Sequence, residues 1–225
     1  MLLHTKVHRK LAPIASQLKV GTIHRSLPSA TMSFSPFQSS RLTYRAISSP
    51  EDDTFFQTLQ TDAQGYANSN FSISKPQSKK SAADFQKYVA EDTMLGVLCC
   101  IPPPTPDSPP IPVACLHLDR LKEAHAQHRN ATLAIDVLPQ YQGQGYGSEA
   151  IKWALRWAFV TRGLHRVNID VFAYNAGAQR LYERLGFRVE GRRREFVWFE
   201  GRWYDDVKLG MLEGEWRELY GEGEV

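Results

Sequence analysis

A glycine-rich segment in the second half of the chain, Gln142-Gly143-Gln144-Gly145-Tyr146-Gly147, has residue types that can bind an anion. A strand-like apolar run precedes it at residues 133–138, and a helix-like apolar stripe follows at 148–161. Small residues at the start of a helix leave consecutive backbone N–H groups exposed at the positive end of the helix dipole. Residues 143–148 are therefore expected to form a cradle suited to a pyrophosphate. A tight turn that only packs a helix against a sheet is the alternative.

Two other phosphate-binding motifs do not fit this segment. A Walker loop requires Gly-Lys-Ser/Thr after its glycines, and the sequence contains no such tripeptide. The dinucleotide fingerprint G-x-G-x-x-G would need glycine at position 148, where serine stands, although Asp170 lies about where its ribose-binding acid would be. About 55 residues follow Asp170, and they predict one helix and one hairpin rather than further βα units.

The charge distribution separates a basic leader from a mildly acidic body. Seven of the 27 lysines and arginines lie in residues 1–50, which contain no acidic residue. The other 20 accompany 24 acidic residues, a balance of −4. This balance argues against a nucleic-acid partner and is compatible with an amine substrate. No apolar run approaches the ~18 residues that span a bilayer, so no membrane association is expected.

The cysteines and the leader indicate a compartment. Cys99, Cys100 and Cys115 show no C-x-x-C spacing, so free thiols are expected in a reducing, cytoplasmic location, with neither a disulfide framework nor a zinc site. Residues 1–36 form a basic leader or tail whose composition is also typical of a mitochondrial presequence. The mitochondrial matrix is therefore the alternative location. Residues 37–225 are expected to form one domain.

The elements that must position the glycine turn follow from apolar periodicity and from turn residues. Before the turn, strands are expected at 42–46, 94–101, 112–118 and 133–138, with helices beginning near Asp53 and at Ser81. Residues 61–80 are polar and predict a connection with at most a brief turn. Seven prolines predict a projecting loop at 101–112. The histidines nearby, His117, His125 and His128, are expected to be solvated.

After the glycine turn, a strand is expected at 166–172. Asn175 can cap a helix at 176–185, and Gly186 stands where a left-handed C-terminal residue belongs. Residues 196–199 and 203–212, joined by the turn pair 200–201, predict a closing hairpin. The tryptophans are expected to pack in the core, although those of the hairpin could instead wall a substrate site; they are Trp153, Trp157, Trp198 and Trp203.

Together these features resemble the GNAT (Gcn-five-related) N-acetyltransferases, in particular their RimJ/RimL-like branch. The resemblance covers residues 42–216 and is strongest over 133–187. It rests on four features in order: the Gln142-x-x-Gly145-x-Gly147 turn, Asn175, Leu181-Tyr182-Glu183-Arg184-Leu185-Gly186-Phe187, and the closing Trp203-Tyr204-Asp205 and Met211-Leu212-Glu213-Gly214-Glu215-Trp216 segments.

The resemblance implies an α+β acyl-CoA N-acyltransferase fold. Its mixed, mostly antiparallel sheet would be flanked by helices and splayed between the fourth and fifth strands, here 133–138 and 166–172. Acetyl-CoA would enter that wedge, and no metal is implied. The cofactor-binding residues would be Ile135, Asp136, Val137, Gln142, Gly143, Gln144, Gly145, Tyr146, Gly147, Ser148, Asn175 and Tyr182.

The resemblance also implies catalytic roles. Tyr182 stands at the position of the family's general acid, and the pKa of a phenol is close enough to that of a thiol to return a proton to sulfur. A packed helix aromatic is the alternative for this residue. Asp170 and Asp136 are both candidates for the base, and either could act through a water because aspartate is one methylene shorter than the glutamate of RimI-like members. The sequence leaves the choice between them open, and the alternative for each is an acid that points to water or forms a satisfied pair.

The implied function is transfer of an acetyl group from acetyl-CoA to a primary amine by direct attack in a ternary complex. The acceptor would be a protein N-terminus, a polyamine or another small amine, and the protein would be a monomer or a homodimer. A CoA-binding sensor or scaffold without transfer activity is the main alternative. A dinucleotide-dependent oxidoreductase is a third.

Overall fold

The structure is a computed structural model that describes residues 36–105 and 107–221. The basic leader expected at residues 1–36 lies outside the described residues, apart from Pro36. Its proposed targeting role therefore stays a prediction. No helix in the described part of the chain is long and apolar enough to cross a membrane.

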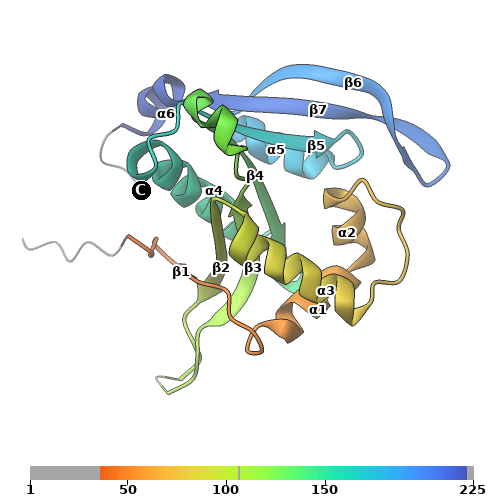
Figure 1. Ribbon diagram of the computed structural model, residues 1–225, viewed down its shortest axis with the longest axis vertical. Coiled ribbons are helices and arrows are strands. Elements are labelled where there is room, and N and C mark those ends of the chain that lie inside the picture. Colours follow the sequence, from red (N-terminus) through yellow and green to blue (C-terminus); the bar gives the residue numbers. More distant parts are fainter. Residues whose placement is uncertain (1–35, 106, 222–225) are drawn as a thin grey trace, which may run out of the picture. The chain divides into compact units, whose positions relative to one another are not determined.

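In the described residues, seven strands form one mixed sheet in the order β1-β2-β3-β4-β5-β7-β6 (Figure 1). Neighbouring strands are antiparallel except for the parallel pair β4 and β5. The strands are β1 (Thr43–Arg45), β2 (Leu95–Ile101), β3 (Ile111–Leu118), β4 (Asn130–Val137), β5 (Arg166–Phe172), β6 (Arg188–Phe199) and β7 (Arg202–Leu212). This topology confirms the expected fold class.

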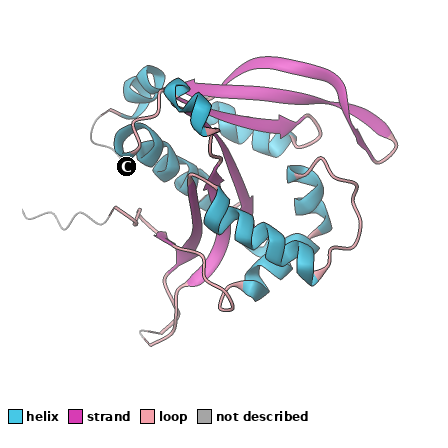
Figure 2. Ribbon diagram, in the orientation of Figure 1, coloured by secondary structure: helices cyan, strands magenta, loops and turns pink. Residues whose placement is uncertain are grey.

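Helices flank the sheet (Figure 2). They are α1 (Asp53–Thr61), α2 (Ala63–Ser69), α3 (Lys79–Lys87), α4 (Tyr146–Arg156), α5 (Ala176–Arg184) and α6 (Glu213–Tyr220), with π-helical turns at Tyr88–Asp92 and Trp157–Thr161 and 3-10 turns at Glu123–His128 and Pro139–Tyr141. The helix expected at 148–161 thus corresponds to α4 and the π-helical turn that continues it.

Apolar side chains on both faces of β2 explain why helices cover the sheet on both sides. Successive strand residues point to opposite faces. Val97 and Cys99 belong to the cluster that α4 completes, whereas Leu98 and Cys100 pack with Phe56 of α1 on the other face. Phe56 is fully buried, and burial of such a side chain stabilises a fold by roughly 1.5–3 kcal/mol. The central strands are therefore fixed between α4 and the α1–α3 layer.

The sheet divides where β4 meets β5. In the described residues these two strands pair at three positions, Asn130–Arg166, Ala131–Val167 and Thr132–Asn168. Farther along, β4 pairs only with β3 and β5 only with β7 among the described strands. This arrangement confirms the expected splay between the fourth and fifth strands.

The residues at the two ends of α5 have the roles that the sequence predicted. The Asn175 side chain caps the helix by accepting a hydrogen bond from the N–H of Ala178 at 3.2 Å. Gly186 follows the helix with a φ of 94°, a left-handed conformation that favours glycine. These two signals mark the start and the end of the helix that follows β5.

The connection at residues 61–80 differs from the expectation, because it contains helix α2. Gly65 lowers helix propensity in this stretch, and tertiary contact overrides that preference. Tyr174 donates a hydrogen bond to the carbonyl oxygen of Ala67, and Ala67 itself is buried. The expectation failed because these contacts join residues that are far apart in the sequence.

Strand β6 is also longer than predicted and begins at Arg188 instead of Phe196. The added residues are mostly exposed, so they lack the apolar alternation that marks a half-buried strand. Pairing with β7 supports them, together with the ion pair between Arg193 and Asp206. Cross-strand charge pairs of this kind contribute to sheet stability.

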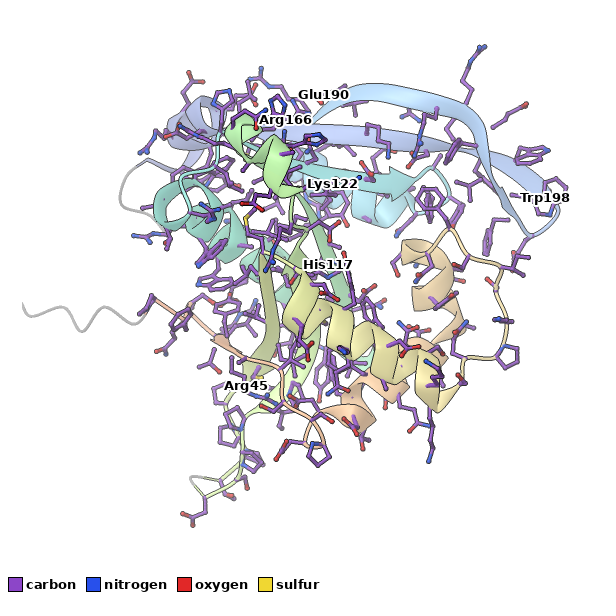
Figure 3. The ribbon with its side chains drawn as sticks, viewed as in Figure 1. Arg45, His117, Lys122, Arg166, Glu190 and Trp198 are labelled. Carbon is purple, nitrogen blue, oxygen red and sulfur yellow. The ribbon has the colours of Figure 1, made fainter. Side chains whose placement is uncertain are left out.

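Two expectations about ring side chains are wrong (Figure 3). His117 is buried rather than solvated, with rings of Phe85 and Tyr88 packed edge-on against it. Trp198 and Trp203 of the hairpin are more than half exposed instead of packed in the core. They contact each other with ring centroids 5.1 Å apart, and Trp198 lies near the tip of the β6–β7 hairpin.

Candidate active site

Beyond their three paired positions, β4 and β5 border a cavity of about 780 Å³. Its other walls are the glycine turn, the start of α5 and helix α2. All the residues predicted to bind the cofactor line this cavity except Gln144, and Asp170 lines it as well. The structure therefore brings nearly all of the candidate site residues to one place.

The glycine turn has the backbone conformation that an anion cradle needs. Gly143 and Gly145 have φ values of 72° and 86°, which residues with a Cβ rarely adopt. Gly145 is the N-cap of α4. The first hydrogen bond of the helix runs from the backbone N–H of Glu149 to the carbonyl oxygen of Gly145, at 3.1 Å. The N–H groups of residues 146–148 precede the first full helical turn and have no partner within the helix. They are free to face an anion.

Two glutamine side chains fasten this turn. Gln142 donates from Nε2 to the carbonyl oxygen of Val137 at 2.9 Å, and Gln144 donates from Nε2 to the carbonyl oxygen of Gln140 at 2.8 Å. The first bond ties the turn to the end of β4. The second explains why Gln144 does not line the cavity, since its side chain folds back onto the preceding 3-10 turn.

Asp136 is a titratable group of the cavity whose pKa is shifted toward neutrality. It lies on β4 opposite Cys115 of β3. Burial raises the pKa of Asp136 to about 6; the Ser69 hydroxyl lowers it in part, and the charge of Asp62 raises it further. A carboxyl group with a pKa near neutrality can accept and release protons at physiological pH. This property is typical of a general base.

Tyr182 lines the same cavity from α5. Its side chain is 8% exposed, and its ring packs edge-on against Phe187. Burial raises the pKa of the Tyr182 phenol well above its usual value, and the charge of Asp136 contributes to the rise. The phenol therefore keeps its proton at physiological pH. Tyr182 is thus both a packed helix aromatic and a potential proton donor.

Asp170 has different surroundings. It is exposed on β5, and its Oδ2 lies 2.5 Å from Nζ of Lys208 on the neighbouring strand β7. The same ammonium group lies 2.9 Å from Oδ2 of the buried Asp206. The carboxylate of Asp170 is therefore held in an ion-pair network at the edge of the cavity.

The sequence interpretation missed the wall that α2 contributes. Asp62, Ser69 and Phe71 line the cavity, although residues 61–80 were expected to be a plain connection. The Asp62 carboxyl group lies over Gly65 at the start of α2. An acidic residue before a short helix is a weak N-cap signal, and this signal could have indicated α2.

The arrangement can bind an anionic group at one end and handle protons at the other. The exposed amides of the glycine turn and the dipole of α4 form the anionic end. Asp136 and Tyr182, which interact electrostatically, form the proton-handling end. In the described ranges 36–105 and 107–221, no three His, Cys, Asp or Glu side chains gather as metal ligands.

Residues 51–187 match the acetyltransferase (GNAT) family, and the chain belongs to that family. This match confirms the resemblance drawn from the glycine turn, Asn175 and the end of α5. The splayed sheet and the cavity at its wedge are consistent with family membership.

Three curated relatives illustrate the similarity. The SPβ prophage-derived N-acetyltransferase YokL of Bacillus subtilis is 34% identical over 85 residues, 38% of this chain and 48% of the relative. The spermidine N(1)-acetyltransferase of Vibrio cholerae is 32% identical over 99 residues, 44% and 57% of the two chains. The ribosomal protein uS5 alanine N-acetyltransferase of Escherichia coli is 29% identical over 84 residues, 37% and 43% of the two chains. The chain thus spans about half the length of the curated relatives it matches.

Two solved structures share the fold over most of the chain. The Vibrio cholerae spermidine N-acetyltransferase, crystallised with CoA and spermine, superposes with a TM-score of 0.66 at 23% identity, covering 79% of this chain and 99% of the other. A GNAT-family acetyltransferase from Bacillus anthracis gives a TM-score of 0.65 at 18% identity, covering 79% and 98%. At these identities the similarity shows the fold.

Proposed function

We propose that this protein transfers the acetyl group of acetyl-CoA to a primary amine by direct attack of the amine in a ternary complex. The observation that carries the proposal is the wedge cavity, which joins an anion cradle to a carboxyl group with a pKa of about 6. Relatives named as spermidine and ribosomal-protein alanine N-acetyltransferases support the same reaction class.

The donor is inferred from the anion end of the cavity. The amides of the glycine turn would bind the pyrophosphate of CoA, as helix N-termini bind phosphate groups in general. Beyond Thr132, the edge of β4 that faces β5 has no strand partner among the described residues. Its backbone groups are available to an extended, amide-containing chain such as pantetheine. The acetyl thioester would then lie between Asp136 and Tyr182.

Asp136 and Tyr182 would share the proton transfers. A primary amine arrives as an ammonium ion with a pKa of about 10 and must lose a proton before it can attack. Asp136 accepts that proton, directly or through a water. As the bond from nitrogen to the acetyl carbon forms and the bond to sulfur breaks, Tyr182 gives its proton to sulfur. The acylated nitrogen then gives its second proton to the Tyr182 phenolate, and the proton on Asp136 passes to solvent, so that both groups return to their starting state.

The charges that line the cavity favour a polyamine as acceptor. Asp62 and Asp136 line the same cavity, and the charge of Asp62 raises the pKa of Asp136. An acceptor with more than one ammonium group would relieve this repulsion, whereas a peptide α-amine carries a single charge at the reacting end. A small polyamine is therefore the proposed first choice, and a peptide N-terminus the second.

The test is thiol release from acetyl-CoA with spermidine, with a free-N-terminus peptide and with no acceptor. We expect the fastest release with spermidine, and Tyr182→Phe should lower kcat by about 10²–10⁴-fold because it removes the acid. CoA binding by calorimetry is measured in parallel for both proteins. Tight CoA binding without release on any amine would overturn the enzyme proposal in favour of a sensor or scaffold. Thermal protection by NAD rather than CoA would indicate an oxidoreductase.

A further inference from the structure

Residues 36–44, which lead into β1, are fastened to α4. Trp153 donates from Nε1 to the carbonyl oxygen of Pro36 at 2.9 Å. Its indole stacks on the ring of Tyr44, with centroids 3.7 Å apart and planes inclined by 8°. The Ser39 hydroxyl donates to Oε1 of Glu149 at 2.7 Å. Residues 36–44 therefore reach the helix that begins at the glycine turn, although about a hundred residues separate them in sequence.

Arg41 makes the central contacts of this segment. Its backbone N–H and its Nε donate to the two carboxylate oxygens of Glu149 at 2.6 and 2.8 Å. Its Nη1 donates to the carbonyl oxygen of Gln144 at 3.0 Å, and its guanidinium lies 4.7 Å from the ring centroid of Tyr146. A single side chain thus touches the glycine turn and the first turn of α4. It does so from outside the cavity, which Arg41 does not line.

The bond to Gln144 sets the direction of a cradle amide. In a trans peptide the carbonyl and the following N–H point in opposite directions. Because Arg41 holds the Gln144 carbonyl outward, the N–H of Gly145 is turned toward the opposite side. Gly145 lines the cavity whereas Gln144 does not. Arg41 therefore fixes the peptide plane between them in the orientation that presents an N–H to the cavity.

The bonds to Glu149 remove an electrostatic conflict. Glu149 lies in the first turn of α4, where its charge would repel a bound pyrophosphate, and its side chain is only 14% exposed. Burial disfavours its ionisation, but hydrogen bonds from Arg41 and Ser39 prevail and lower the pKa of Glu149, so it is a carboxylate. Solvent screens this charge poorly. The guanidinium of Arg41 supplies the compensating positive charge.

We propose that Arg41 is a positioning residue for the pyrophosphate of CoA. It acts through Gln144 and Glu149, orienting the Gly145 amide and neutralising the carboxylate beside the cradle. The inference rests on the proposed use of acetyl-CoA and goes beyond it, because it assigns part of the donor site to the segment before β1.

The test is CoA and pantetheine binding measured by calorimetry on the full chain. Pantetheine lacks the pyrophosphate, so Arg41→Ala should weaken CoA binding at least about tenfold, or ~1.4 kcal/mol, and leave pantetheine binding unchanged. Arg41→Lys keeps the charge without the fork that bonds Gln144 and Glu149 together, and should fall between. In the double variant Arg41→Ala, Glu149→Gln, part of the lost CoA affinity should return because the uncompensated charge is gone.

The matched control is Arg166→Ala. Arg166 is ion-paired with Glu190 across β5 and β6 and lies outside the cavity lining (Figure 3). This variant should bind CoA like the parent even if its unfolding temperature falls. Thermal unfolding of every variant without ligand reports whether it is folded. If Arg41→Ala does not fold, the comparison is made with Arg41→Lys.

The outcomes separate the two proposals. A parent protein that does not bind CoA overturns the proposed function and this inference with it. A parent that binds CoA, with Arg41→Ala and Arg41→Lys binding equally well, overturns the inference alone. Equal loss of CoA and pantetheine affinity in folded Arg41 variants also overturns it, because the effect would not act through the pyrophosphate.

Discussion

Nζ of Lys208 lies 2.5 Å from Oδ2 of Asp170 and joins β7 to β5 at the edge of the cavity. This ion pair distinguishes the environment of Asp170 from that of Asp136, the two carboxylates that the sequence offered as possible bases. Asp170 has a cation at hydrogen-bonding distance, whereas the pKa of Asp136 is raised to about 6 by burial and by the charge of Asp62. The environment of Asp136 is the one that suits a base near neutral pH.

We therefore expect Asp136→Asn to lower kcat by about 10²–10⁴-fold, the usual contribution of a general base. Asp170→Asn should lower it by less than about tenfold, because it breaks a partly exposed ion pair. Steady-state kinetics with saturating acetyl-CoA and spermidine measure both values. The two substitutions are isosteric, so each is the control for the other. The reverse order of effects would assign the base to Asp170.

The activity of the parent protein should depend on the ionisation of Asp136. Since the base must be unprotonated, kcat/KM is expected to rise with pH through about 6 and then to level off. The measurement is a pH profile from pH 5 to 8 in buffers of constant ionic strength. In Asp136→Asn the remaining activity should lose this ascending limb. A limb that persists unchanged in the variant would contradict the assignment.

The same group predicts a pH-dependent change in stability. Its pKa is raised in the folded protein, so the folded state keeps a proton at a pH where the unfolded chain has released it. The stabilising contribution is present below about pH 4 and is lost as the pH rises through about 6. Asp136→Asn should therefore be more stable than the parent at pH 7.5, by at most about 3 kcal/mol.

Thermal unfolding checks this prediction. The difference in unfolding temperature between Asp136→Asn and the parent should be small at pH 4.5 and should grow toward pH 7. A difference that is constant over this range would mean that the substitution acts through packing rather than through charge. A variant that is more stable and less active would show a stability cost at a functional group.

The glycine turn permits a prediction with a matched control. Gly145 and Gly201 both have positive φ, 86° and 77°, so alanine at either position costs roughly 1–2 kcal/mol of stability. At Gly201 an added Cβ meets nothing within 4 Å, whereas at Gly145 it would lie 3.1 Å from Nη2 of Arg41. Both variants should unfold at lower temperature than the parent, as measured by calorimetry.

Only Gly145→Ala should also weaken CoA binding, by about tenfold or more, because the cradle amide moves with the backbone. Gly201 lies in the turn between β6 and β7, outside the residues that line the cavity. If both alanine variants lost CoA affinity to the same extent, reduced folding and not cradle geometry would be the cause.

The parts of the site that the sequence predicted depend on short-range signals. The glycine turn, the Asn175 cap and the left-handed Gly186 are each specified by a few neighbouring residues, and the structure has all three. The apolar periodicity of β4, β5 and α4 likewise reflects local burial patterns. These elements carry the family resemblance, and that resemblance implied the wedge.

The parts that could not be predicted depend on contacts between distant residues. Helix α2 is supported by Tyr174, which is over a hundred residues away, and Arg41 reaches Glu149 over a similar separation. The raised pKa of Asp136 comes from burial under α2 and from Asp62, so it followed from no pattern within β4. The ion pair that distinguishes Asp170 needed the β5–β7 register.

The short pairing between β4 and β5 has a consequence for the resistance of the protein to proteolysis. Within the described ranges, three residue pairs connect the half-sheet β1–β4 to the half-sheet β5–β7 through these strands. A donor molecule bound in the wedge against the open edge of β4 would fill the gap between the two halves. Binding to the folded state alone adds RT ln(1 + [L]/Kd) to stability. We therefore expect the lifetime of this protein under proteolysis to follow the supply of acetyl-CoA.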